Sequence, residues 1–279
     1  MNLDLKRQLQ INACKVRMGV VEATNCAQSG HPGGSLSITD ILTYLYFAEM
    51  NINPQDPKMQ SRDRFVLSKG HTAPALYSVL ALRGFFPLED IKTLRKANSH
   101  LQGHPSMHMT PGVDMSTGSL GQGVSVAVGL ALGAKISNQD YRIYTALGDG
   151  EIEEGQVWEA AMFAAAKGLD NLVAVIDNNN LQIDGTIEEV IGLNNLSEKI
   201  SSFGLNVINC DGNNIEEIIV AIKKAKKSNK LSCIIAKTIK GKGVSFMENN
   251  GAWHGKPTNP EQYKQAMQEL KNTLSELEA

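Results

Sequence analysis

The chain has 279 residues, of which 42% are apolar and 20% are charged, as is typical of a globular protein. Its formal net charge of −2 excludes the strongly basic surface with which proteins bind nucleic acid or anionic membranes. No apolar stretch is long enough to span a bilayer, so we expect no membrane partner.

The predicted elements alternate between helix and strand. Two helices come first, and the charged segment 1–16 lacks the apolar region of a signal peptide. Apolar runs predict strands at residues 65–68, 142–147, 172–176, 205–209 and 232–237. A helix is predicted at 154–167, and an amphipathic helix at 260–277 closes the chain. With no repeat or linker, residues 1–279 are expected to form a single α/β domain, a parallel sheet flanked by helices.

The four cysteines show neither metal-ligand nor redox spacing and imply no disulfide framework; they are Cys14, Cys26, Cys210 and Cys233. This usage favours a reducing, cytoplasmic environment in which the thiols act as small apolar side chains.

Polar residues end two neighbouring strands. Gly148-Asp149-Gly150 follows one strand, and Asp177-Asn178-Asn179-Asn180 follows the next. A right-handed crossover makes these strands parallel, so Asp149 and Asn179 are expected at the same carboxyl edge of the sheet. One carboxylate and one amide can share a hard cation such as Mg²⁺, and a diphosphate ligand would complete its shell.

The residues around Asp149 support an anion site. Gly148 and Gly150 are expected to allow a tight turn, and the following helix to direct its amino-terminal amides toward the anion. The carboxylates of Glu151, Glu153 and Glu154 would repel a bare diphosphate, which an intervening divalent ion would remedy.

This pattern resembles the thiamin diphosphate enzymes, in which a Gly-Asp-Gly is followed just under thirty residues later by paired asparagines. Here 27 residues, 151–177, separate Gly150 from Asn178. The resemblance implies that Asp149 and Asn179 are side-chain ligands of Mg²⁺ and that Leu181 is its backbone carbonyl ligand. It also implies a thiamin diphosphate-binding fold.

The rest of the chain resembles the amino-terminal half of transketolase nearly from end to end. The resembling blocks are Ser-Gly-His-Pro-Gly-Gly (29–34), Arg-Phe-Val-Leu-Ser-Lys-Gly-His (64–71), Gly-His-Pro (103–105), Thr-Gly-Ser-Leu-Gly-Gln-Gly (117–123), Lys-Thr-Ile-Lys-Gly-Lys-Gly-Val (237–244) and Trp-His-Gly (253–255). Four separate loops thus each bring one histidine.

The resemblance implies roles for these histidines. His71 and His254 would contact the diphosphate and thiazolium, and His31 and His104 would face the oxygens of a sugar. The implied catalytic residues are His31, His104 and His254, because neutral imidazoles can donate or accept protons near pH 7. The implied cofactor-binding residues are His71, Gly118, Leu120, Gly150, Glu154, Asn179, Ile183 and His254.

Two further features concern histidines and lysines of these blocks. His100, His104 and His108 have helical spacing, but Pro105 and Pro111 oppose a helix, so the two outer histidines are assigned to the surface. Lys240 and Lys242 could bind phosphate or could belong to a flexible basic loop, and the sequence leaves both readings open.

The resemblance implies a transketolase, which transfers a two-carbon ketol unit from a ketose phosphate to an aldose phosphate with thiamin diphosphate and Mg²⁺. A reaction of the pentose phosphate pathway and a specialised catabolic transfer would look alike in this sequence. In the family a second domain binds the aminopyrimidine and supplies the activating glutamate, and this sequence does not contain it. We therefore expect the amino-terminal subunit of a split transketolase, paired with a carboxyl-terminal subunit in a heterotetramer with a homodimeric core. Glu154 and Glu159 match positions near the subunit interface.

Three other classes of protein share part of this pattern. A deoxyxylulose phosphate synthase or a 2-oxo acid dehydrogenase subunit would share the metal motif, but the histidine blocks favour transketolase. A nicotinamide-nucleotide dehydrogenase would need a third glycine where Glu153 stands. A purely structural subunit would leave the four histidine loops and the metal pair unexplained.

Overall fold

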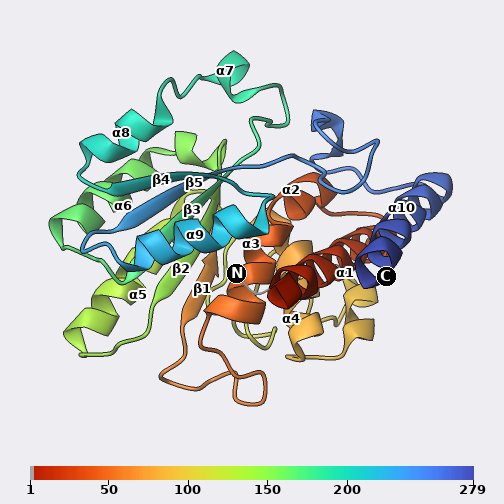
Figure 1. Ribbon diagram of the computed structural model, residues 1–279, viewed down its shortest axis with the longest axis horizontal. Helices are drawn as coiled ribbons and strands as arrows, with labels where there is room; N and C mark the ends of the chain where they lie inside the picture. Colours follow the sequence, from red (N-terminus) through yellow and green to blue (C-terminus); the bar gives the residue numbers. More distant parts are fainter. Residues whose placement is uncertain (1–2) are drawn as a thin grey trace.

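A computed structural model describes residues 3–279; Met1 and Asn2, part of the predicted first segment and of the predicted domain, lie outside the described residues. Its strands are β1 (Arg64–Leu67), β2 (Ile143–Gly148), β3 (Leu172–Asn178), β4 (Asn206–Asp211) and β5 (Ser232–Lys237). They form one parallel sheet in the order β1-β2-β3-β5-β4 (Figure 1). The predicted parallel sheet flanked by helices is confirmed.

Both faces of the sheet are buried, which explains why the strands read as unbroken apolar runs. Alternate residues of a strand point to opposite faces, so Phe65 and Leu67 join one core cluster and Val66 the other. The first cluster is covered by α1 (Leu3–Ala27), α3 (Thr39–Tyr44), α4 (Ala73–Arg83) and α9 (Ile215–Lys226). The second is covered by α5 (Gln122–Ile136), α6 (Gly155–Ala166) and α8 (Leu196–Ser202).

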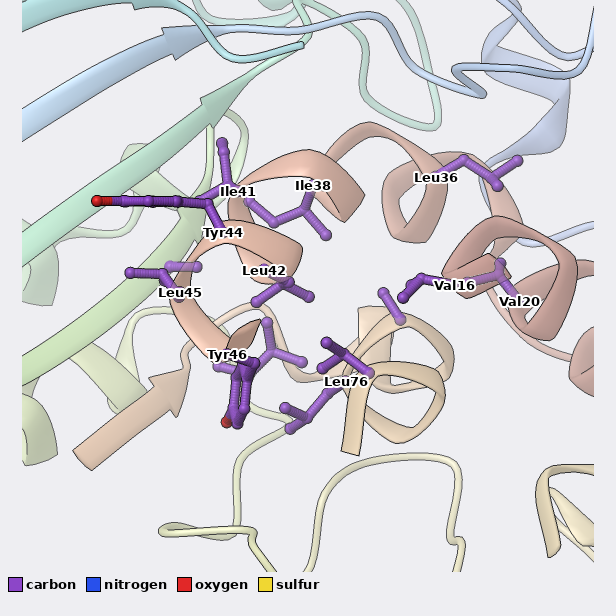
Figure 2. Packing of buried hydrophobic residues seen from close by; sticks show 14 of the residues in the cluster. Val16, Val20, Leu36, Ile38, Ile41, Leu42, Tyr44, Leu45, Tyr46 and Leu76 are labelled. Atoms are coloured by element: carbon purple, nitrogen blue, oxygen red, sulfur yellow. The ribbon is translucent and has the colours of Figure 1, made fainter. Parts of the chain in front are cut away.

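The first cluster extends beyond the sheet into packing between the amino-terminal helices. Figure 2 shows Val16 and Val20 of α1 close to Leu36 of α2 (Pro32–Ser37) and Leu76 of α4. This packing buries α2. The buried helix anchors the loop that precedes it and therefore the position of His31.

The remaining elements are short, apart from the last helix. They are η1 (Leu45–Glu49), η2 (Gly70–Thr72), η3 (Leu88–Thr93), η4 (Glu151–Glu153), α7 (Ile187–Val190), η5 (Gly251–Trp253) and α10 (Pro260–Glu278). Helix α10 packs against α1, where the Cys14 thiol donates to the Leu270 carbonyl at 3.1 Å. Within residues 3–279, no helix combines the length and apolar character needed to cross a membrane.

Element boundaries differ from the predictions near the candidate site. Strand β3 continues two residues past the predicted end at 176, so Asp177 and Asn178 pair with β5 inside the sheet. Helix α6 begins at Gly155, after the separate turn η4, so the amino end of the helix does not directly follow Gly150. Because all five strands are parallel, their carboxyl ends still meet at one edge.

A close approach between α5 and β1 makes a first prediction. A Cβ atom on Gly123 would lie 2.6 Å from the Ser68 Cα, whereas a Cβ on Gly129 of the same helix meets nothing within 4 Å. Gly123→Ala is therefore expected to lower the free energy of unfolding by about 1–3 kcal/mol through overpacking. Gly129→Ala, the matched control, should raise it by roughly 0.5–1 kcal/mol through helix propensity. Urea unfolding of the purified chain measures both, and equal effects would contradict the proposed contact.

Candidate active site

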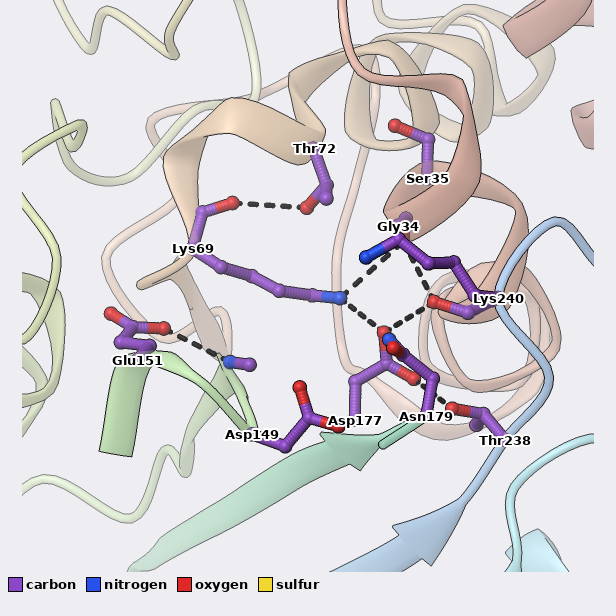
Figure 3. Close-up of polar contacts among 12 residues, drawn as sticks. Gly34, Ser35, Lys69, Thr72, Asp149, Glu151, Asp177, Asn179, Thr238 and Lys240 are labelled. Carbon is purple, nitrogen blue, oxygen red and sulfur yellow. Dashed lines mark hydrogen bonds and ion pairs between the residues drawn. The ribbon is translucent and has the colours of Figure 1, made fainter. Parts of the chain in front are cut away.

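A buried ion pair lies beneath the carboxyl edge of the sheet. Lys69, which follows β1, is paired with Asp177 of β3, and their side chains are 2% and 0% exposed. The Lys69 ammonium also donates to the Gly34 carbonyl at 3.3 Å, and Ser37 and Thr238 both donate to the Asp177 carboxylate (Figure 3). The pair therefore fixes helix α2 and the segments after β1 and after β5 relative to β3. Sequence reasoning missed this pair, although both residues lie within the motifs that it singled out.

Glu151 does not face a ligand as expected. Its side chain is buried and accepts hydrogen bonds from the Ser68 hydroxyl, the Gly121 amide at 2.9 Å and the Gly148 amide at 3.0 Å. The expectation that this carboxylate would repel a bare diphosphate was wrong, because the side chain turns into the fold and joins three loops.

Gly150 differs from expectation in a similar way. Its φ of −69° is an ordinary helical value, so the turn does not need the left-handed freedom of glycine. Instead, a Cβ atom on Gly150 would lie 3.1 Å from the Gln182 side chain, which donates to Glu153 at 2.7 Å. Glycine here leaves room for the close approach of the Gln182 side chain from a neighbouring loop.

Three of the predicted histidines come together above this edge. The ring centroid of His31 lies 5.1 Å from that of His71 and 5.4 Å from that of His254, and His71 and His254 stack at 5.3 Å. They come from three distant segments: the turn before α2, the turn η2 after β1, and the end of η5. The His31 Nδ1 atom is buried and has no hydrogen-bond partner among the described residues, so a polar group of a ligand could satisfy it.

The cluster holds its imidazoles uncharged. Burial, with a smaller effect of Arg95, lowers the pKa of His31 to about 4. Burial and the nearby Lys240 lower the pKa of His254 to about 3, and burial and Lys69 lower the pKa of His71 well below its usual value. At pH 7 all three rings can therefore both donate and accept hydrogen bonds.

His104, the fourth predicted histidine, lies at the rim of this cluster. Its side chain is exposed, its pKa is lowered mainly by partial burial, and its ring lies 3.2 Å from the Cβ position of Gly118. Leu120, Glu154 and Ile183 are exposed, and a Cβ on Gly121 would lie 3.0 Å from the Glu154 Cβ. These exposed residues do not contact the three-histidine cluster and could be covered by other molecules.

The two outer histidines differ from one another. No helix forms at residues 100–108, as Pro105 predicted, and His108 is exposed. His100 is half-buried, because its ring packs against Phe86 at 4.9 Å and bonds to Asp90 at 3.1 Å. Its assignment to the surface was therefore wrong.

The predicted metal ligands lie together beside the ion pair. The Asp149 carboxylate is buried and accepts the Gly150 amide at 3.0 Å and the Asn180 amide, which leaves a free lone pair on each oxygen. Asn179 is also buried, and its side-chain oxygen accepts the Leu181 amide at 3.2 Å. Burial and the Asp177 carboxylate raise the pKa of Asp149 to about 6, so a cation beside these carboxylates would favour the ionised form.

Lys240 and Lys242 have different positions. The Lys240 side chain is 2% exposed, and its ammonium donates to the Leu181 carbonyl at 2.7 Å and contacts the His254 Nδ1 atom at 3.1 Å. Burial lowers the pKa of Lys240 to about 8. Lys242 instead forms an outer ion pair with Glu248 at 3.2 Å. Only Lys240 therefore reaches the candidate site.

The loop that carries Lys240 is anchored by a second polar network. Arg17 of α1 donates to the Lys242 carbonyl at 3.0 Å and is paired with Asp40. Asn213 donates to the Asp40 carboxylate at 2.9 Å and accepts the Ile239 amide at 2.9 Å. These bonds fix the loop on both sides of Lys240, so the reading of a flexible basic loop was wrong.

The donors at this edge fit a diphosphate cofactor held through Mg²⁺. Among residues 3–279, no three His, Cys, Asp or Glu side chains form a metal site of their own. One buried carboxylate, one amide oxygen and one carbonyl are nonetheless the incomplete oxygen shell that Mg²⁺ completes with phosphate and water. Lys240 and the neutral histidines add donors for the phosphate oxygens, and the orphan His31 Nδ1 needs a partner.

Comparisons with known proteins agree with this geometry. Residues 7–274 match the family described as "Transketolase, thiamine diphosphate binding domain". A 6-deoxy-6-sulfo-D-fructose transketolase subunit, SqwG, of Clostridium sp. (strain MSTE9) is 46% identical over 96% of this chain and 96% of its own length. An apulose-4-phosphate transketolase subunit of Phocaeicola vulgatus is 43% identical over 97% of this chain and 96% of its own. The crystal structure of Campylobacter jejuni transketolase superposes with a TM-score of 0.90 at 35% identity, over 99% of this chain but 46% of that one.

The buried ion pair makes a second prediction. Asp177→Asn leaves Lys69 buried and unpaired, so the free energy of unfolding is expected to fall by about 3–5 kcal/mol. Asp170→Asn, which removes an exposed pair with Lys135, should cost about 0–1 kcal/mol. Urea unfolding measures both, and a loss for Asp177→Asn as small as that of the control would contradict the role of the pair.

The lowered pKa values of the histidines predict how the stability of the chain depends on pH. Between about pH 6.5 and pH 4 the unfolded chain binds protons at His31 and His254 more readily than the folded chain. At these two histidines, acidification through this window should therefore lower the free energy of unfolding, whereas Asp149, whose pKa is raised to about 6, contributes in the opposite direction. His254→Gln, which keeps an acceptor for Lys240, should make that decrease smaller, and replacement of the exposed His108 should not. Urea titrations at several pH values test this, and parallel pH profiles for wild type and His254→Gln would refute it.

Proposed function

Because this chain belongs to the transketolase family, we propose that it is the amino-terminal subunit of a two-subunit transketolase that uses thiamin diphosphate and Mg²⁺. The observation that carries the proposal is the meeting of three uncharged histidines with Asp149 and Asn179 at one sheet edge. Membership of this family argues against the nicotinamide-dehydrogenase alternative.

The cofactor-binding residues follow from their positions. Asp149, Asn179 and the Leu181 carbonyl would hold Mg²⁺, with Gly150 beside the diphosphate. The Lys240 ammonium lies next to the Leu181 carbonyl, from where it would donate to a phosphate oxygen. Gly118, Leu120, Glu154 and Ile183 complete the proposed cofactor set; the last three are exposed and suit a cofactor shared with a partner.

The chemistry divides between cofactor and protein. Bound thiamin diphosphate supplies a nucleophilic carbon that allows the bond beside a ketone to be broken and reformed. His31 and His104 would donate to or accept from the hydroxyl groups of the sugar, and His71 and His254 would bind the cofactor side, where His254 also relays protons. Their low pKa values leave each ring free of a fixed charge at pH 7.

A carboxyl-terminal subunit with the pyrimidine-binding domain is the proposed partner. The two relatives named as subunits align over 96% of their own lengths, whereas the Campylobacter transketolase is matched over 46% of its chain. We also propose a heterotetramer with a homodimeric core. Exposed apolar side chains support an interface near Glu154 and Glu159; they are Leu120, Met162 and Phe163.

The proposed reaction is transfer of a two-carbon ketol unit between sugars that carry an anionic group. The relatives named above act on a sulfonated ketose and on a ketose phosphate, so both remain candidate donors for this chain. Residues 1–279 are further proposed to act as one domain in the cytoplasm, which the free state of all four cysteines favours.

The experiment that tests this function is reconstitution. The chain is mixed with its carboxyl-terminal subunit, thiamin diphosphate and Mg²⁺, and ketol transfer from xylulose 5-phosphate to an aldose phosphate is followed. We expect activity only with both subunits. Asp149→Asn should lower kcat/KM by about 100-fold or more, since it replaces a charged metal ligand with a neutral one.

Asp140→Asn is the matched control, because this exposed carboxylate precedes β2 at the end of the strand opposite to Asp149. It should leave kcat/KM within about twofold of wild type. Turnover by the isolated chain would refute the two-subunit proposal, and full activity of Asp149→Asn would refute the metal site.

A further inference from the structure

A strained turn beside the histidine cluster carries Arg95. Its φ is +60°, in the left-handed region that costs a side-chain-bearing residue about 1–2 kcal/mol. The turn is closed by the Arg95 amide, which donates to the Leu101 carbonyl at 2.8 Å, and Asn98 within it also has a positive φ, of 65°. Backbone strain held in place by the surrounding fold is a reason to look for function.

The Arg95 guanidinium has a defined position. Its Cζ atom lies 2.8 Å from where a Cβ of Gly103 would be, so the guanidinium lies against the backbone of that residue. The next residue is His104, and the Tyr77 hydroxyl donates to the carbonyls of Gln102 and His104, at 2.9 and 3.1 Å. The guanidinium therefore lies beside a segment that the Tyr77 hydroxyl anchors, at the rim of the candidate site.

The Arg95 charge has no partner of its own. Among residues 3–279, no carboxylate pairs with this guanidinium and no carbonyl accepts a hydrogen bond from it, and the side chain is exposed. Its charge acts on His31 and His104, whose pKa values it lowers further after burial has lowered them. The adjacent Lys96 is also exposed but acts on Cys26, on another side of the turn.

We propose that Arg95 binds the tetrahedral oxyanion, phosphate or sulfonate, of a sugar whose keto end faces His31 and His104. This inference rests on the proposed function and deepens it, because it assigns recognition of the anionic end of the substrate in part to this subunit. Both groups present pairs of oxygens that a planar guanidinium can bind through two parallel hydrogen bonds.

Arg95→Asn is the best variant for the test, because asparagine tolerates the left-handed backbone and removes the guanidinium. Arg95→Lys keeps the charge without the bidentate geometry, and Lys96→Asn is the matched control. In the reconstituted two-subunit enzyme, kcat/KM is measured for xylulose 5-phosphate, 6-deoxy-6-sulfofructose and uncharged xylulose.

We expect Arg95→Asn to lower kcat/KM for the charged donors by about 10- to 100-fold, mainly through KM, as for the loss of charged hydrogen bonds. The loss for xylulose should be at least five times smaller. Arg95→Lys should recover part of the loss, and Lys96→Asn should match wild type. Whichever charged donor shows the larger loss identifies phosphate or sulfonate as the group bound.

Equal losses on charged and uncharged donors would overturn the inference, since they would mean that Arg95 only shapes the turn. Losses below about twofold on every donor would overturn it as well. If wild type transfers no ketol unit, the proposed function fails separately, and calorimetric binding of arabinose 5-phosphate to the two-subunit complex decides the role of Arg95. A Kd that rises about tenfold in Arg95→Asn supports the inference, and an unchanged Kd, or no binding by wild type, overturns it.

Discussion

The ion pair between Lys69 and Asp177 is the interaction on which the site depends. It lies below the surface, where Asp177 also accepts hydrogen bonds from Ser37 and Thr238. These partners come from four segments that are far apart in the sequence, and each segment leads directly to a candidate residue: His31, His71, Asn179 or Lys240. A buried charge left unpaired costs several kcal/mol, so the pair makes the relative placement of these loops a condition of folding.

The charges around this pair explain the electrostatics of the candidate site. Asp149 lies near Asp177, and burial together with the charge of Asp177 raises the pKa of Asp149. Lys69 neutralises one of them, and Lys240 lies near both, with a lowered pKa. The histidines around them remain uncharged, so a divalent cation with a diphosphate can be added without a large net charge in a buried place.

Two polar networks serve as the frame for residues that would contact ligands. Glu151 joins the loops after β1, before α5 and after β2, and Arg17, Asp40 and Asn213 hold the loop around Lys240. These side chains are polar and sit next to the site, yet the hydrogen bonds and ion pairs above join them to other parts of the protein. Their position explains why a charged residue inside a functional motif need not touch the ligand.

The sequence by itself determined the parallel α/β fold and the common edge of Asp149 and Asn179, because apolar runs and the handedness of crossovers are local rules. Its resemblance to transketolase singled out the histidine loops. The sequence could not determine which motif side chains point inward. Glu151 points into the fold, and His100 is half-buried. Lys240 lies in the candidate site and Lys242 in an outer ion pair, although only one residue stands between them in the sequence. Only the tertiary structure decided these outcomes and the pairing of Lys69 with Asp177, since a buried charge takes whichever partner the packing of distant segments places within reach.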